Sequence, residues 1–239
     1  MYLIENKQLE VMTFGEKIFK YYQQINVPQD LPTGVEVLYP FDSTEVADLT
    51  RSFYMRYFND KRPRTFLIGI NPGRFGGGST GIPFTDPKIL EEKLQIPNTL
   101  DKRHELSSRF VYQMIDALGG PEKFYDSFYF TSVCPLGFVR DGKNLNYYDD
   151  KALEEALEEY MAGEMRKQLD FGGNEIAFSL GMGKNIKFLK EFNRRHNLFK
   201  EIRPLPHPRW IMQYRLKRLD EFIGVYRETL APFMPDFHK

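Results

Sequence analysis

Apolar residues gather in four short runs that alternate with longer stretches of helical periodicity. The runs lie at 65–70 (TFLIGI), 127–133 (SFYFTSV), 175–180 (EIAFSL) and 199–205 (FKEIRPL). Three amphipathic stretches separate them, at 105–120, 149–169 and 183–196, and a last helix is predicted from about 211 to 230. Alternating strands and helices are typical of a parallel sheet that is covered on both faces. The pattern therefore predicts an α/β fold, a three-layer α/β/α sandwich around a four-stranded, mainly parallel sheet.

The N-terminal part contributes two further amphipathic helices, predicted at 9–25 and 44–58. No shift in composition separates this part from the rest of the chain. We therefore expect residues 1–239 to form a single domain, with a helical part over about 1–60 packed on the same core.

Each of the four predicted strands runs into an unusual segment at its carboxyl end. These segments are INPGRFGGGSTG (70–81), VCPLGFVRDGKN (133–144), GMGKN (181–185) and PLPHPRW (204–210). In open α/β sheets, ligands bind beyond the carboxyl ends of the strands. The sequence therefore predicts a site at this edge of the sheet.

Composition and charge narrow the function classes. Apolar residues make up 41% and charged residues 28% of the chain, and 33 basic residues balance 33 acidic ones, which disfavours a highly charged nucleic-acid coat protein. No apolar run is long enough to span a bilayer, and MYLIENKQLEVMTF lacks the order of a signal peptide. The single cysteine, Cys134, reads as an inert buried thiol in a reducing compartment. We expect a cytoplasmic, intracellular monomer of bacterial type, without contact to a membrane.

No metal site or cofactor is expected. The four histidines, His104, His196, His207 and His238, are scattered along the chain, and one cysteine cannot hold an iron–sulfur cluster. Nothing in the sequence points to an activated lysine for Schiff-base chemistry, so lyase activity is not expected.

The glycine-rich stretch after the first strand matches two generic patterns. Gly76 to Gly81 fits GxGxxG of dinucleotide-binding proteins, and Gly77 to Gly81 fits GxSxG with Ser79 as nucleophile. Both patterns require the motif to follow the strand directly, whereas this strand is predicted to end near Ile70 and Pro72 forces irregular backbone. These interpretations are therefore disfavoured.

A third match is more specific. Asn71-Pro72-Gly73, Phe75-Gly76 and Thr80-Gly81-Ile82-Pro83-Phe84 resemble the first motif of the single-strand-selective monofunctional uracil-DNA glycosylases. Cys134-Pro135-Leu136 with Gly142-Lys143-Asn144-Leu145 is similar to the second-strand motif of that family, and Pro206-His207-Pro208 to the start of its last motif. Gly181-Met182-Gly183-Lys184 resembles the turn between them. The resemblance covers about residues 37–229 and implies a DNA glycosylase, within the uracil-DNA glycosylase superfamily, that flips its target base out of the DNA.

The resemblance implies a role for each matched residue. Asn71 would position the attacking water, and a neutral His207 would donate a hydrogen bond to the uracil oxygen on which negative charge grows. Phe84 would stack on the flipped base, and Ile70 would contact the base. The glycines of the loop, Gly76 and Gly77 among them, would let the backbone approach the nucleotide closely.

One difference from the classical uracil enzymes of the superfamily and two departures from the resembled family bear on the expected specificity. Gly73 stands where the uracil-specific enzymes of the superfamily carry a tyrosine that excludes thymine, so 5-hydroxymethyluracil becomes an expected substrate. Ser132 stands where the resembled family has an asparagine that reads the uracil edge, and a hydroxyl cannot make both hydrogen bonds at once. After His207 the chain enters a helix almost at once, without the family's longer wedge, which favours single-stranded substrates.

Basic residues near the strand ends are candidate DNA contacts, and they predict cleavage or binding that weakens with salt. The basic candidates are Arg74, Lys143, Lys184 and Arg209, together with Arg203, Arg215 and Lys217, and the other candidate DNA contacts are Gly76, Gly77, Pro208 and Trp210. Trp210 and Met212 read either as wedge residues or as packing of the last helix. Glu36, isolated in VEVLY, reads as a solvated strand face more readily than as an aid to the attacking water.

Two other functions stay open at this point. One is a nucleotide- or dinucleotide-binding enzyme that uses the glycine loop, which NAD or ATP would protect from thermal unfolding. The other is a non-catalytic nucleic-acid-binding relative, in which Ser132 marks the lost activity. Such a protein would bind uracil-containing DNA without producing abasic sites.

Overall fold

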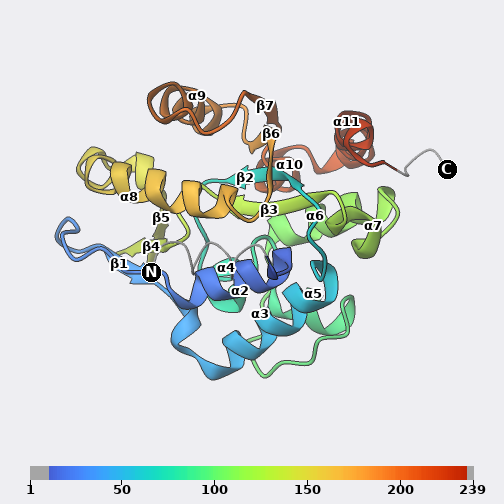
Figure 1. Cartoon of the computed structure of the whole chain (residues 1–239), viewed down its shortest axis with the longest axis horizontal. Coiled ribbons are helices and arrows are strands. Elements are labelled where there is room, and N and C mark those ends of the chain that lie inside the picture. Colours follow the sequence, from blue (N-terminus) through green and yellow to red (C-terminus); the bar gives the residue numbers. More distant parts are fainter. Residues whose placement is uncertain (1–10, 236–239) are drawn as a thin grey trace.

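The computed structural model describes residues 11–235, and its centre is a four-stranded sheet (Figure 1). The strands are β2 (Arg64–Gly69), β3 (Phe128–Ser132), β6 (Gly173–Leu180) and β7 (Glu201–Leu205). They lie in the order β3-β2-β6-β7, and every neighbouring pair is parallel. The four predicted strands and their parallel arrangement are confirmed. Parallel strands place their carboxyl ends at one edge, so the four unusual segments come together.

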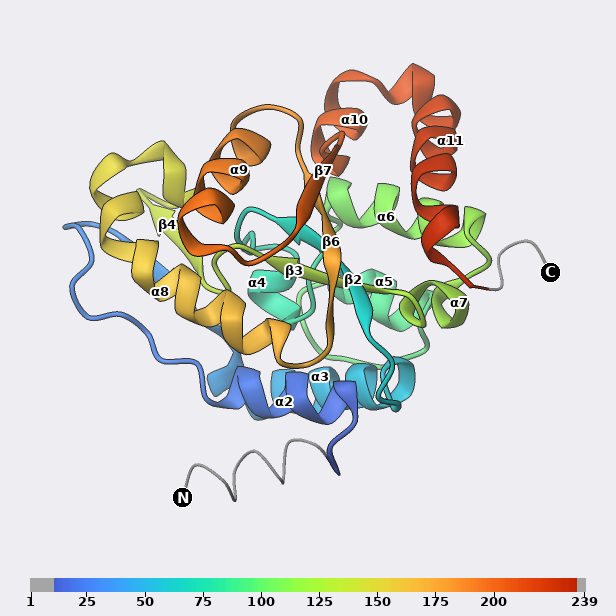
Figure 2. The same ribbon diagram turned by 45° about the horizontal axis from the view of Figure 1, so that its top comes forward.

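Helices cover both faces of this sheet, as the three-layer prediction requires. On β3, Phe130 packs against Phe124 of α7 (Pro121–Tyr125), while its neighbour Tyr129 contacts Phe14 of α2 (Phe14–Gln23) on the opposite face. The alternation of side chains along a strand explains why adjacent residues meet different helices. Figure 2 shows the sheet between α2 and α8 (Lys151–Leu169) on one side and α6 (Leu106–Ala117), α7 and α11 (Leu219–Leu230) on the other.

The two predicted N-terminal helices are present as α2 and α3 (Thr44–Tyr57), which pack against each other. Thr13 begins α2 with a capping box: its hydroxyl accepts from the N–H of Glu16, whose carboxylate accepts from the N–H of Thr13. The start of the predicted 9–25 helix, and most of MYLIENKQLEVMTF, lie outside the described residues.

The predicted last helix is two helices. α10 (Pro208–Tyr214) and α11 are separated by a 3₁₀ turn, η3 (Leu216–Arg218), because Arg215 leaves the helical region with φ −135° and ψ 22°. The break turns the chain directly after the segment that follows β7, and it sets α10 against α6. An apolar periodicity that continues through the break concealed it from the sequence pattern.

A second, small antiparallel sheet was not predicted. It contains β1 (Glu36–Leu38), β4 (Gly137–Arg140) and β5 (Lys143–Leu145) in the order β1-β4-β5. A tight turn joins β4 to β5, with Asp141 and Gly142 both at positive φ. The turn carries the Lys143–Leu145 segment back toward the main sheet.

The remaining elements are short, apart from one helix that follows β6. That helix is α9 (Lys184–His196), and the short ones are α4 (Gly77–Thr80), α5 (Pro87–Glu92) and the 3₁₀ turns η1 (Pro40–Asp42), η2 (Tyr147–Asp149) and η4 (Ala231–Phe233).

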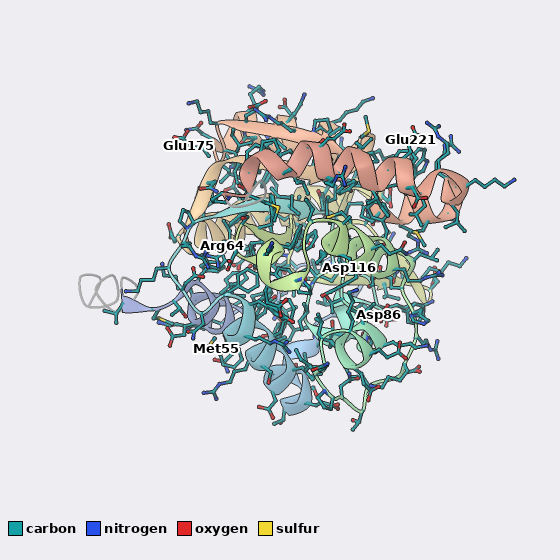
Figure 3. All side chains as sticks on the ribbon, turned by 90° about the vertical axis from the view of Figure 1, so that its right-hand side faces the viewer. Met55, Arg64, Asp86, Asp116, Glu175 and Glu221 are labelled. Atoms are coloured by element: carbon teal, nitrogen blue, oxygen red, sulfur yellow. The ribbon has the colours of Figure 1, made fainter. Side chains whose placement is uncertain are left out.

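At the amino end of β2, the guanidinium of Arg64 is completely buried (Figure 3). It pairs with both oxygens of Asp60, at 2.6 and 2.9 Å, and donates from Nε to the carbonyl of Tyr125 at 2.9 Å. The rings of Phe14 and Phe58 lie 5.2 and 5.4 Å from its central carbon. Burial raises the pKa of Asp60, but hydrogen bonds from Arg64 and Arg62 outweigh it and hold the pKa well below its usual value.

Candidate active site

A cavity of about 860 Å³ opens at the carboxyl ends of the strands. The segments after β2, β6 and β7 all line it, and Ser132 reaches it from the end of β3. Phe84, Glu105 and part of the Lys143–Tyr148 stretch complete the wall. The predicted convergence of strand ends on one site is therefore present in the fold.

Asn71 lies two residues beyond the end of β2 and lines this cavity. Its side-chain N–H donates to the carbonyl of Leu145 at 3.2 Å, and this bond sets the orientation of the amide. The amide oxygen Oδ1 is buried and has no partner. A buried acceptor without a partner is costly in a folded protein, so it marks a place where a water or a ligand can bind.

His207 lines the same cavity and is also the N-cap residue of α10. The backbone N–H of Arg209 donates to its Nδ1 at 3.1 Å. A neutral imidazole with Nδ1 as acceptor carries its proton on Nε2, so Nε2–H is available as a donor. Burial, followed by the charge of Arg209, lowers the pKa of His207 to about 4, which keeps the ring neutral at physiological pH.

Phe84 lies in a backbone conformation that phenylalanine rarely adopts, with φ +54°. Packing on both sides holds it there. A Cβ added to Gly69 would come within 2.9 Å of the Phe84 ring, and the ring of Phe130 is 5.3 Å away. Strain of this kind persists where surrounding structure over-determines a position, as in ligand sites. Ser132, which is 7% exposed, lines the cavity nearby.

Some glycines of the 73–81 loop are required by close contacts within the protein rather than by a ligand. A Cβ on Gly76 would lie 2.0 Å from Glu105 Oε2, and one on Gly78 would lie 2.7 Å from the carbonyl oxygen of Gly73. Gly76 does not line the cavity, whereas Ile70, Gly73 and Gly77 do. The expectation that the glycines admit the nucleotide therefore fits only part of the loop.

Glu105 is a wall residue that the sequence reasoning missed. It precedes α6, its backbone N–H donates to Asp86 Oδ2 at 2.9 Å, and its carboxyl group accepts from the Ser108 hydroxyl at 3.4 Å. Burial raises its pKa, although the charge of Arg209 opposes the shift. An acid directly before a helix is an ordinary helix start in sequence, so only the fold shows that it faces the glycine loop.

The predicted DNA contacts divide into two groups. Those that line the cavity are Arg74, Lys143, Lys184, Arg209 and Trp210. The other four, Pro208, Arg203, Arg215 and Lys217, do not line it, although the guanidinium of Arg215 lies 4.8 Å from the ring of Trp210, which does. Arg203 pairs with Glu201 on the same strand, at 2.8 Å, and Pro208 is buried as the first residue of α10. Met182, Tyr148, Gln213 and Tyr214 line the cavity without having been predicted.

The structure also places the residues of the interpretations that the sequence disfavoured or left open. Ser79 donates to the carbonyl of Gly76 at 2.9 Å and does not line the cavity, and the loop of residues 70–76 separates β2 from α4. Glu36 is exposed on β1 and also lies outside the cavity lining. Met212 is 5% exposed and belongs to the core, which leaves Trp210 as the exposed residue of the pair. Cys134 is buried, and burial raises its pKa to about 12.

Between residues 11 and 235, no group of three or more His, Cys, Asp or Glu side chains is arranged to hold a metal ion, and His238 lies outside that range. Over the same residues, no helix combines the length and the apolar character that a bilayer crossing requires.

The layered sheet carries its cavity at the strand ends, and comparison with known proteins identifies the chain as a DNA glycosylase. The family model of the uracil DNA glycosylase superfamily matches residues 55–231, and the chain belongs to that superfamily. It is a monofunctional enzyme of DNA repair that hydrolyses N-glycosidic bonds. Its structure is similar to the crystal structure of wild-type SMUG2 from Pedobacter heparinus, with 42% identity and a TM-score of 0.89. The similarity covers 93% of this chain and 98% of that one. The expected relation to the single-strand-selective enzymes is confirmed.

Proposed function

We propose that this enzyme excises uracil, and uracils with small C5 substituents such as 5-hydroxymethyluracil, from DNA. One observation carries the proposal: an unpaired amide oxygen of Asn71 and an imidazole of His207 with its proton on Nε2 line the same cavity. An acceptor can hold a water, and a neutral donor can stabilise an oxygen on which negative charge develops.

The reaction follows from these two groups. The flipped nucleotide enters the cavity, and the bond between the base nitrogen and the sugar C1′ breaks with both electrons passing to the base. The sugar becomes oxocarbenium-like, and a water that donates a hydrogen bond to Asn71 Oδ1 attacks C1′ through its oxygen. Nε2–H of His207 donates to the uracil oxygen that takes up the charge. The attacking water loses a proton to solvent, the departing base anion takes one up from solvent, and the products are an abasic site and the free base.

Neighbouring residues would shape the specificity. Phe84 would stack on the base, and Ile70 would contact it. Ser132 would make a single hydrogen bond to the base edge, which relaxes discrimination between bases. A Cβ on Gly73 would meet nothing closer than 3.4 Å, so space remains for a substituent.

Single-stranded DNA is the proposed preferred form. α10 begins at Pro208, directly after His207, and this leaves no insertion that could wedge into a duplex. Flipping a base from a duplex costs a few kcal/mol, which an enzyme without a wedge does not recover. We further propose that the enzyme acts as a monomer, inside the cell, on DNA that carries uracil or a modified uracil.

The test is a cleavage panel of matched single- and double-stranded oligonucleotides that carry uracil, 5-hydroxymethyluracil or thymine. We expect abasic product from the first two bases, a preference for single strands, and a loss of about 10²–10³ in rate for His207→Ala. Absence of product with uracil would overturn the function, and equal rates on both forms would overturn the strand preference. An undiminished rate in His207→Ala would remove the role given to the imidazole.

A further inference from the structure

Three aromatic side chains that line the cavity each have a cation near the ring. Phe75 lies under Arg74 at 4.6 Å and under Arg103 at 5.2 Å, measured from the guanidinium carbon to the ring centroid. For Trp210 and Arg215 this distance is 4.8 Å. The ammonium nitrogen of Lys184 lies 5.7 Å from the ring centroid of Tyr148. We call Phe75, Tyr148 and Trp210 the rim aromatics.

The rim aromatics come from three separate segments of the chain. Phe75 belongs to the loop after β2, Tyr148 to η2, and Trp210 to α10. Neither the hydrophobic pattern nor the family motifs unites them, and only the fold brings them to one opening. Their recurrence on independent segments argues against a chance contact of one flexible cation with one ring.

The surroundings of these rings are exposed and apolar to an unusual degree. Trp210 is 39% exposed, Tyr214 one turn further along α10 is 60% exposed, and Met182 is 62% exposed. All three line the cavity. Large apolar side chains grouped on a protein surface mark a binding site more often than isolated ones do.

Two of the four cations beside the rim aromatics are free to bind an anion. Among the described residues, Arg74 and Arg215 make no ion pair within 4 Å, whereas Arg103 pairs with Asp101 at 2.6 Å. Arg209 and Lys143, which also line the cavity, make no ion pair with a described residue. Lys184 shares its charge with Asp149 at 3.2 Å. Unpaired cations beside aromatic rings that are exposed, as Trp210 is, or half-buried, as Phe75 is, complement a polymer that combines phosphates with flat bases.

We infer that the rim aromatics and their cations bind unpaired nucleotides next to the target base, with bases stacked on the rings and phosphates bound by the cations. This inference rests on the proposed function, and it explains strand preference by a built binding surface rather than by a missing wedge alone. Only unpaired DNA offers free base faces for stacking, because the bases of a duplex already stack on each other.

Trp210 provides a direct probe, because it is the only tryptophan of the chain. Its fluorescence can be followed while the protein is titrated with a uracil-free single-stranded oligodeoxynucleotide, and separately with the matching duplex. We expect saturable quenching by the single strand and a binding constant at least about tenfold weaker for the duplex. Equal quenching by both forms would overturn the inference, and so would binding of the single strand without any change in fluorescence.

Variants test the energetic contribution of the rings. Trp210→Ala and Tyr148→Ala should each raise the Kd for the single strand, and the KM for a single-stranded uracil substrate, by about tenfold with a smaller effect on kcat. Trp210→Phe should recover most of the lost affinity, since a phenyl ring still offers a stacking face. A purely structural role of Trp210 would instead lower thermal stability without selective loss of single-strand binding.

A matched control is available far from the cavity lining. Phe19 of α2 lies under Arg51 at 6.0 Å and is likewise partly buried, yet it does not line the cavity. Phe19→Ala should leave the Kd for the single strand unchanged, and a loss equal to that of Trp210→Ala would contradict the inference. Because the binding assay uses no uracil, its result does not depend on whether the enzyme excises uracil.

Discussion

The two ends of β2 differ in whether a buried polar side chain has all its hydrogen-bond partners. At the amino end, both terminal nitrogens of Arg64 pair with Asp60, and its Nε donates to a carbonyl. Past the carboxyl end, Asn71 keeps one amide oxygen that is buried without any partner. The first arrangement contributes to the stability of the fold, whereas the second leaves hydrogen-bonding capacity for another molecule. The pairing of Arg64 is thus consistent with a structural role, and the unpaired oxygen of Asn71 is consistent with the role that we propose for it.

The largest expected effect is at the amino end. Arg64→Ala would remove the buried partner of Asp60, leaving it only the exposed Arg62, would leave the Tyr125 carbonyl without its Arg64 donor, and would open a void between Phe14 and Phe58. We expect a loss of about 3–5 kcal/mol in the free energy of unfolding. Chemical denaturation measures it, and the kcat of the remaining folded enzyme should change little.

Arg62→Ala is the control for that variant. Arg62 also pairs with Asp60, at 2.7 Å, but its side chain is 55% exposed. An exposed pair contributes less than about 1 kcal/mol. Equal losses in the two variants would contradict the distinction between the buried and the exposed partner.

The next effect is expected at Asn71, past the carboxyl end of β2, where a substitution should lower the cleavage rate and leave the stability of the fold nearly unchanged. Asn71→Ala removes the acceptor for the attacking water, and we expect the cleavage rate to fall by about 10²–10⁴. The free energy of unfolding should change by less than about 1 kcal/mol, because losing the hydrogen bond to the Leu145 carbonyl is offset by removing the unsatisfied Oδ1. Single-turnover cleavage and denaturation of the same preparation measure both quantities.

Asn193 offers the matched amide. Its Nδ2 donates to Phe199 O at 2.8 Å, and its Oδ1 accepts from the N–H groups of Leu198 and Phe199. Asn193→Ala should therefore destabilise the protein by about 1–3 kcal/mol and leave the rate intact. The comparison fails if Asn71→Ala and Asn193→Ala behave alike.

The last prediction concerns pH: protonation of His207 should cause almost no change in the cleavage rate near neutral pH. Since the pKa of His207 is about 4, the imidazole is neutral from pH 8 down to about pH 5. The cleavage rate should show no inflection near 6.5, the ordinary histidine value, that follows from protonation of this ring. An inflection there that disappears in His207→Gln would contradict the lowered pKa.

The same shift has a consequence for stability. Between pH 6.5 and about 4, the unfolded chain binds a proton at His207 that the folded chain does not bind. The contribution of this group to the free energy of unfolding therefore decreases as the pH falls through that window.

The sequence predicted the four strands of the main sheet and the unusual segments that follow them, because apolar runs followed by glycine and proline are local signals. It could not predict Glu105 in the cavity wall or the pairing of β1 with β4, since both depend on contacts between distant segments. The β4–β5 hairpin is local, and its Asp141-Gly142 turn is a signal that the sequence interpretation missed. Arg203 is a different case. Glu201 and Arg203 are two residues apart on a strand and lie on one face, so their pairing could have been foreseen. The break at Arg215 left no trace in the apolar periodicity, which continues through it.

The hydrogen bond from the Arg209 N–H to His207 Nδ1 has two effects: it caps the start of α10, and it leaves the ring proton on Nε2. A main-chain donor, present in nineteen of the twenty amino acids, fixes which ring nitrogen carries the proton. The side chain at position 209 can therefore vary without loss of this hydrogen bond, although losing the charge of Arg209 would remove the smaller of the two causes that lower the pKa of His207. Proline alone lacks that donor. A proline at position 209 would remove both the N-cap hydrogen bond of α10 and the donor that holds His207 Nδ1 as an acceptor.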